Sequence, residues 1–170
     1  MILKLIGAAL VVAGCGGVGF RIAADQRQEE RDIRQLVGAL DYMECELQYR
    51  LTPLPALCKH IAKEWPNRIG KVFLDFSAEM DSQNEHDTSA CMLVALAHNI
   101  SLSVDTRQMF ELLGKSIGRF DVEGQLKGLE SVRQECRRKL TALESNRDVR
   151  LRSYKTLGLC AGAALAILFV

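Results

Sequence analysis

The two ends of this chain are almost free of charge, and this constrains the fold more than any other feature. Residues 1–20 read MILKLIGAALVVAGCGGVGF with Lys4 as the one charged side chain, and residues 156–170 read TLGLCAGAALAILFV with none. A helix of roughly 17–25 apolar residues can cross a bilayer. We therefore expect membrane-spanning helices at 1–20 and 154–170. Buried core helices are the alternative, unusual here because both segments are apolar on every face.

Small residues recur every fourth position in both apolar segments. Such stripes let membrane helices approach closely, so that dispersion and backbone contacts hold them together. We expect the two stripes to pack on each other or on partner helices. They consist of Ala9, Ala13 and Gly17 in the first segment and Gly158, Gly162 and Ala166 in the second.

Basic residues flank both predicted spans on the side of the middle domain. Arginines follow the first span at 21, 27, 31 and 34, and Arg147, Arg150, Arg152 and Lys155 precede the second. The positive-inside rule then places residues 21–153 in the cytoplasm. One signal favours the opposite orientation, because Val12 to Cys15 read like a lipoprotein cleavage site and lipidation of Cys15 would put the domain outside. The apolar run continues past Cys15 to Phe20, which is unusual for a lipoprotein.

The middle of the chain, residues 21–153, is predicted to be a soluble all-α bundle of about six helices. Apolar residues step by three and four along it, and no stretch alternates with period two. The long first and last helices share this spacing, so we expect them to pair within the chain, with coiling between chains as the alternative. The fourth predicted helix starts at Asp87 or Thr88, with Leu93, Val94, Ala97 and Ile100 facing inward.

Capping residues and proline indicate where these helices begin and end. We expect Thr52 to be an N-cap with Pro53 at the first helical position, where its missing N–H has no effect. Asn67 is a second expected cap. Gly118 suits a left-handed C-cap and Asp121 an N-cap, so the stretch GKSIGRFD closes one helix and opens the next.

Sequence patterns for catalysis, cofactors and metals are missing. Gly114-Lys115-Ser116 ends like a phosphate-binding loop, but Met109 stands where its first glycine is required and no strand precedes it. The sequence has no CxxC pair, and Cys58 paired with His98 as nucleophile and base has no support from spacing. We therefore expect no enzyme, no cofactor, no metal site and no small-molecule substrate.

The charge of the chain limits the classes of partner that we expect. A net charge of +1 gives no electrostatic case for nucleic acid. Arg133, Arg137 and Arg138 form the densest basic cluster, read either as a solvated helix face or as a docking patch for an acidic partner. The scattered cysteines at 45, 58, 91 and 136 are typical of reduced, buried thiols.

Four stretches, in their order and spacing, resemble the stage III sporulation protein AB family of endospore-forming bacteria over essentially the full length. They are the opening MILKLIGAALVVAGCGGVGF, the segment at 33–57 that ends in LTPLPAL, LGKSIGRFDVEGQ at 113–125, and the closing RLRSYKTLGLCAGAALAILFV. The lipoprotein-like Cys15 is not expected of that family. No single stretch is specific alone.

The resemblance implies a part in a sporulation complex in the mother-cell membrane facing the forespore, needed for late forespore gene expression. By analogy with the inner-membrane platform of type II secretion, it implies docking of a hexameric ATPase, stage III sporulation protein AA, and of other membrane proteins of the complex. The alternative is an outward-facing scaffold or lipoprotein that binds channel rings. If the chain docks the ATPase, nucleotide belongs to that partner rather than to this chain.

Overall fold

The computed structural model describes the backbone of residues 2–50, 52–82, 87–118 and 121–169, and the side chains of 24–50, 52–82, 87–118 and 121–145. These residues form helices and no strand, which confirms the all-α class. In chain order the helices are α1 (Ile2–Tyr49), α2 (Leu54–Glu64), α3 (Arg68–Asp81), α4 (Thr88–His98), α5 (Val104–Ser116) and α6 (Val122–Phe169).

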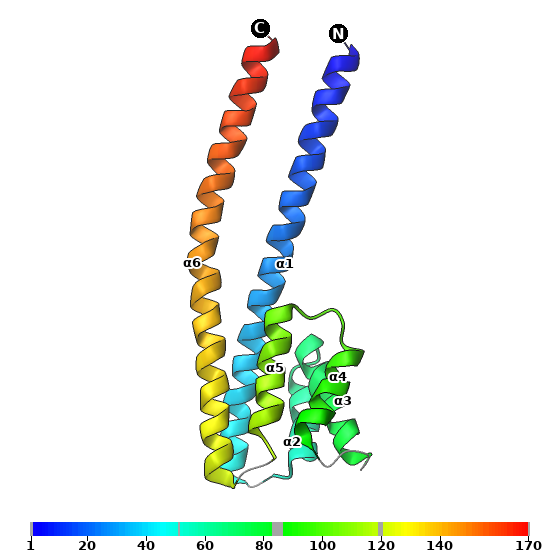
Figure 1. Ribbon diagram of the computed structural model, residues 1–170, viewed down its shortest axis with the longest axis vertical. Helices are drawn as coiled ribbons and strands as arrows, with labels where there is room; N and C mark the ends of the chain where they lie inside the picture. The colour runs from blue at the N-terminus through cyan, green and yellow to red at the C-terminus, as the bar shows by residue number, and fades with distance from the viewer. Residues whose placement is uncertain (1, 51, 83–86, 119–120, 170) are drawn as a thin grey trace.

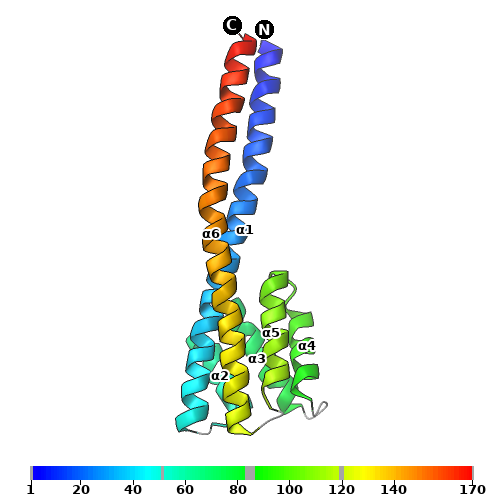
Figure 2. The same cartoon turned by 60° about the vertical axis from the view of Figure 1, so that its left-hand side comes forward.

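Helices α1 and α6 are far longer than the others and set the shape of the molecule. Each has 48 residues, which corresponds to about 70 Å of helix. They pack on each other and project together beyond the four short helices, so that their far ends lie side by side (Figures 1 and 2). The predicted pairing of the first and last helix within the chain is confirmed.

The predicted membrane spans fall on the projecting ends of this pair. Residues 1–20 and 154–170, including both small-residue stripes, lie outside the part of the chain whose side chains are described. Within the described part, none of the helices combines the length and the apolar character that a bilayer crossing requires.

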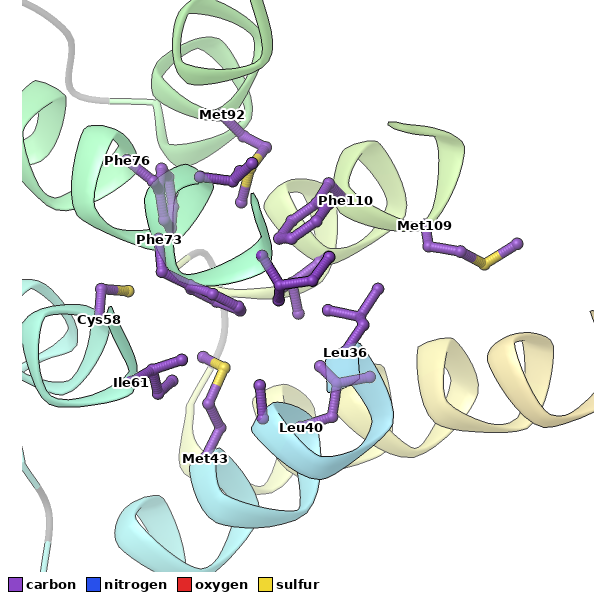
Figure 3. Packing of buried hydrophobic residues seen from close by; sticks show 14 of the residues in the cluster. Leu36, Leu40, Met43, Cys58, Ile61, Phe73, Phe76, Met92, Met109 and Phe110 are labelled. Atoms are coloured by element: carbon purple, nitrogen blue, oxygen red, sulfur yellow. The ribbon is translucent and has the colours of Figure 1, made fainter. Parts of the chain in front are cut away.

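The hydrophobic core lies where α1 meets the short helices. Leu36, Leu40 and Met43 from α1 are fully or almost fully buried. Figure 3 shows them facing the aromatic side chains of α3 and α5. Phe73 and Phe110 meet edge to face with ring centroids 5.4 Å apart, a favoured aromatic geometry. This core holds one end of α1 inside the bundle.

Side chains cap the starts of α3, α4 and α6, as expected for Asn67 and Asp121. Asn67 Oδ1 accepts hydrogen bonds from the backbone N–H of Ile69 and Gly70, and Asp87 Oδ1 accepts one from Ser89. At the start of α6, the N–H of Gly124 donates to Asp121 Oδ1 at 3.0 Å.

The start of α2 differs from the prediction. Pro53 occupies the N-cap rather than the first helical position, and Thr52 lies before it without capping the helix. The Thr52 hydroxyl instead donates to Glu46 Oε2 at 2.9 Å. Glu46 is a buried carboxylate that also pairs with Arg50. Thr52 therefore satisfies a buried acceptor at the end of α1.

The predicted inner face of α4 is also wrong. Leu93, Val94, Ala97 and Ile100 are exposed, and the opposite side of the helix is buried. The side chains that face the core are Cys91, Met92, Ala95 and Leu96. The helix is apolar on both sides, so periodicity could not decide between them.

Candidate functional site

The exposed side of α4 is the most unusual surface in the described part of the chain. We call Leu93, Val94, Ala97 and Ile100 the outer α4 face. Leu93 is 53% exposed and Ile100 is 83% exposed. The α4 sequence TSACMLVALAH contains no Asp, Glu, Lys or Arg. Surface helices normally carry charge on the solvent side, and a contiguous exposed apolar patch commonly marks an interaction site.

Polar contacts at its C-terminal end hold α4 in a fixed orientation. Asn99 follows the helix, and its Nδ2 donates to Asp75 Oδ2 on α3 at 2.7 Å and to the carbonyl of Ala95 at 2.8 Å. From α5, Arg107 Nη1 donates to the carbonyl of Leu96 at 3.0 Å. The outer α4 face is therefore presented by a helix tied to both neighbours, which lowers the entropy lost on docking.

The segment Gly114-Lys115-Ser116, which resembles the end of a phosphate-binding loop, takes part in the packing of α5 against α4. A Cβ added to Gly114 would lie 2.6 Å from Met92 Cβ, so this glycine permits the close approach of α5 to α4. The Thr88 hydroxyl lies 3.1 Å from the Gly114 carbonyl oxygen and 2.6 Å from that of Ile117. Gly118 follows with a φ of +84°, the left-handed conformation of a C-cap glycine. These residues end a helix and form no phosphate cradle.

The predicted basic patch does not lie together as free charge. Arg133 is only 20% exposed and faces α1, where its Nη1 donates to Asp41 Oδ1 at 2.9 Å and also pairs with Glu44. Arg138 is 77% exposed and pairs with Glu135 of its own helix. Arg137 is exposed. Arg133 thus links α6 to α1, and only the other two arginines have the exposure that a docking role requires.

A second polar cluster lies where α1 and α6 leave the short helices. We call Glu29, Ser103, Asp105 and Lys139 the shoulder cluster. The Ser103 hydroxyl donates to Glu29 Oε1 at 3.1 Å, and Lys139 on α6 pairs with Asp105 on α5. Burial, together with a hydrogen bond to Asp105, raises the pKa of Glu29 above its ordinary value. The hydrogen bond from Lys139 lowers the pKa of Asp105.

Neighbouring contacts reinforce this junction. Asp32 is buried on α1, accepts a hydrogen bond from Gln28, and lies 3.7 Å from Arg68 Nη1. Arg68 also donates to the carbonyl of Ser101, between α4 and α5. The connection between α4 and α5 is therefore fixed to the base of the paired helices at two places, which makes it a rigid part of the bundle.

The cysteines and histidines whose side chains are described show no arrangement for chemistry. Burial raises the pKa of the Cys58 thiol, and His98 is exposed, so Cys58 keeps its proton rather than acting as a nucleophile. Cys91 and Cys136 are also buried, whereas Cys45 is exposed, contrary to the expectation for it. Among the side chains described, no group of three or more His, Cys, Asp or Glu is placed to hold a metal ion.

Sequence reasoning missed the outer α4 face, although one signal for it was available. The eleven residues of α4 lack charged side chains altogether, and this absence marks either a buried helix or an interface helix. The shoulder cluster had no comparable signal, because its members come from three helices.

Comparison with known proteins places the chain in a family. The profile of stage III sporulation protein AB matches residues 4–170. The stage III sporulation protein AB of Bacillus subtilis (strain 168) is 27% identical over 170 residues, which cover 99% of each chain. A solved structure of a stage III sporulation protein AB (SpoIIIAB) has a TM-score of 0.64 at 22% identity, covering 72% of this chain and 98% of the solved one. With nearly its whole length matched, this chain belongs to the stage III sporulation protein AB family.

Proposed function

We propose that this protein is a non-enzymatic adaptor of the sporulation machinery, anchored in the mother-cell membrane that faces the forespore. In this proposal residues 1–20 and 154–170 span the membrane, and the basic residues that follow and precede them keep the helical bundle in the cytoplasm. The bundle docks a cytoplasmic ATPase that resembles stage III sporulation protein AA, and the spans contact other membrane proteins of the complex. Its role in sporulation rests on the family.

The observation that carries the adaptor role is the outer α4 face. Leu93, Val94 and Ala97 are exposed on a helix that has no Asp, Glu, Lys or Arg, and Asn99 and Arg107 fix that helix to its neighbours. Together with Ile100 beyond the end of the helix, they expose on the order of 400 Å² of apolar surface, the size of patch that is often functional on a single protein. The ATPase contact is assigned to Leu93, Val94 and Ala97 and does not include Ile100. We assign this face to the ATPase because it places exposed apolar side chains on one helix that carries no Asp, Glu, Lys or Arg.

Binding of the purified ATPase to the full chain in lipid nanodiscs tests this proposal. The double variant Leu93→Ser and Val94→Ser removes apolar contacts from the outer α4 face, and we expect it to weaken binding at least about tenfold, equivalent to about 1.4 kcal/mol. Val122→Ser is the matched control, since Val122 is 42% exposed and Val94 is 38% exposed. Val122 is the first residue of α6, and this end of α6 lies away from α4 in both views (Figures 1 and 2).

The outcomes separate the parts of the proposal. If the double variant and the control bind the ATPase with equal affinity, the ATPase binds a surface other than the outer α4 face. If the parent chain does not bind the ATPase although both proteins are folded, the platform role is wrong. The outward-facing scaffold is then favoured, and Cys15 is tested for lipid by mass spectrometry.

A further inference from the structure

We propose that the connection between α4 and α5, residues 99–103 with Val104, rests on the surface of the membrane that α1 and α6 enter. Ile100 and Val104 insert into the boundary between headgroups and acyl chains. This inference rests on the membrane anchoring in the proposed function and adds a second, peripheral contact with the same bilayer.

Exposure makes Ile100 and Val104 stand out. They are 83% and 72% exposed and lie four positions apart, near the two ends of the connection. Leu102 between them is buried, so the connection has one apolar side chain anchored in the bundle and two directed outward. Among the described large hydrophobic residues only Tyr49 is comparably exposed, at 77%, and it ends α1 at the opposite end of the bundle.

The connection lies at the end of the bundle from which α1 and α6 project (Figure 1). The hydrogen bond from Ser103 to Glu29 fixes its height along α1. Glu29 lies nine positions after Phe20, the last residue of the predicted span. At 1.5 Å per residue, the connection is about 14 Å from the edge of the hydrocarbon core when α1 stands upright.

The headgroup region and the usual tilt of membrane helices account for this distance. Headgroups occupy about 5–8 Å on each side of the core, which leaves a gap of about 6–9 Å. The connection runs from the start of α5 toward α4, on the side of α5 that faces away from α1 (Figure 1), so its α4 end is about two interhelical distances or 18 Å to the side. A tilt of about 20° toward α4, the average for such helices, lowers it by about 6 Å and brings it to the headgroups.

The charge beside the connection suits an anionic membrane surface. The Arg68 side chain is 45% exposed and donates to the carbonyl of Ser101. Its remaining donors are available to lipid phosphate, because a guanidinium has five N–H groups. The same side chain lies 3.7 Å from Asp32, which keeps it beside the connection. An apolar pair next to a cation is typical of peripheral membrane contacts.

Tryptophan fluorescence of the full chain in nanodiscs tests the contact. Trp65 is the only tryptophan, so each probe is placed in a Trp65→Phe background that is checked for helix content. Ile100→Trp reports on the connection and Tyr49→Trp on the far end of the bundle. Nanodiscs of anionic lipid are prepared with and without bromine on the acyl chains, which quenches tryptophan at close range. We expect the brominated lipid to lower the fluorescence intensity of Ile100→Trp at least twofold. The intensity of Tyr49→Trp should fall by less than a tenth.

A third probe, Phe20→Trp, separates this inference from the proposed anchoring. Quenching of Phe20→Trp without quenching of Ile100→Trp leaves the spans intact and overturns the peripheral contact. Absence of quenching at both positions overturns the anchoring and the contact together. If Ile100→Trp is unquenched but its emission shifts to the blue as protein concentration rises, a second copy covers the connection and the lipid assignment is wrong.

Discussion

Arg133 Nη1 on α6 donates a 2.9 Å hydrogen bond to Asp41 Oδ1 on α1, a residue ninety-two positions earlier in the chain. The same guanidinium pairs with Glu44 on α1 and with Glu130 on α6. Three carboxylates thus surround one partly buried cation at the seam between the two long helices. The contact fixes the register of α1 against α6, on which the direction of the projecting ends depends.

Replacing Arg133 by Gln should destabilise the fold through this seam. The substitution leaves Asp41, Glu44 and Glu130 facing one another without a cation, and we expect a loss on the order of 1 kcal/mol in the free energy of unfolding. Chemical denaturation of the full chain in detergent micelles measures it. Arg138→Gln is the control, because Arg138 is exposed and pairs within its own helix. Equal losses in the two variants would remove the special role of Arg133.

The shoulder cluster predicts how stability depends on pH. Burial and the hydrogen bond to Asp105 raise the pKa of Glu29, so the folded chain keeps a proton that the unfolded chain has released. The free energy of unfolding therefore falls as pH rises from the ordinary value of 4.5 through the raised pKa. Glu29→Gln cannot ionise and its amide can donate to Asp105, so we expect its melting temperature to decline less across this window.

Thermal unfolding followed by circular dichroism between pH 4 and pH 8, in about half-unit steps, checks this expectation. Glu123→Gln is the control, since Glu123 is exposed at the start of α6. Parallel profiles for Glu29→Gln and the parent chain would contradict it. Asp105 acts in the opposite sense, because Lys139 lowers its pKa and the stability it contributes is lost as pH falls below 3.8.

The sequence was sufficient for the helices themselves but not for how α4 is rotated. Period-3.6 spacing and the caps at Asn67, Asp87 and Asp121 locate helix starts, because these are local properties of the chain. The orientation of α4 depends instead on Gly114 opposite Met92, a contact between different helices. An apolar helix gives no periodic signal from which that contact can be inferred.

The polar contacts between helices could not be predicted from the sequence for the same reason. Arg133 was grouped with Arg137 and Arg138 because they are neighbours in sequence, yet its partners Asp41 and Glu44 lie on α1. Glu46 is likewise buried at the end of α1, where it accepts a hydrogen bond from Thr52 in the turn that follows. Charged side chains look alike in a sequence whether they face water or a distant partner.

Thiol labelling should distinguish the cysteines by their burial. Cys45 is exposed, whereas burial raises the pKa of Cys58 and raises that of Cys136 to about 12. We expect maleimide to modify Cys45 in the native chain and to reach Cys58 and Cys136 only after denaturation. Peptide mapping by mass spectrometry assigns the label. Rapid native labelling of Cys58 would mean that the contact of α2 with the core opens readily.

Two glycine substitutions should change stability in opposite directions. Gly118 has a φ of +84°, and a Cβ there would lie 2.3 Å from Thr88 Cγ2. Gly118→Ala should lower the free energy of unfolding by about 1–2 kcal/mol from the left-handed backbone alone. Moving Thr88 would further disturb its contact with Ile117 O.

Gly38→Ala is the matched substitution in a helix interior. Its Cβ would lie 3.5 Å from the Trp65 ring, an ordinary contact, and alanine is favoured over glycine in a helix by about 0.5–1 kcal/mol. We therefore expect Gly38→Ala to raise the denaturation midpoint and Gly118→Ala to lower it, measured side by side in detergent. A stabilising effect of Gly118→Ala would show that residues 117 and 118 relax into a right-handed turn. The assignment of Gly118 as the C-cap glycine of α5 would then be wrong.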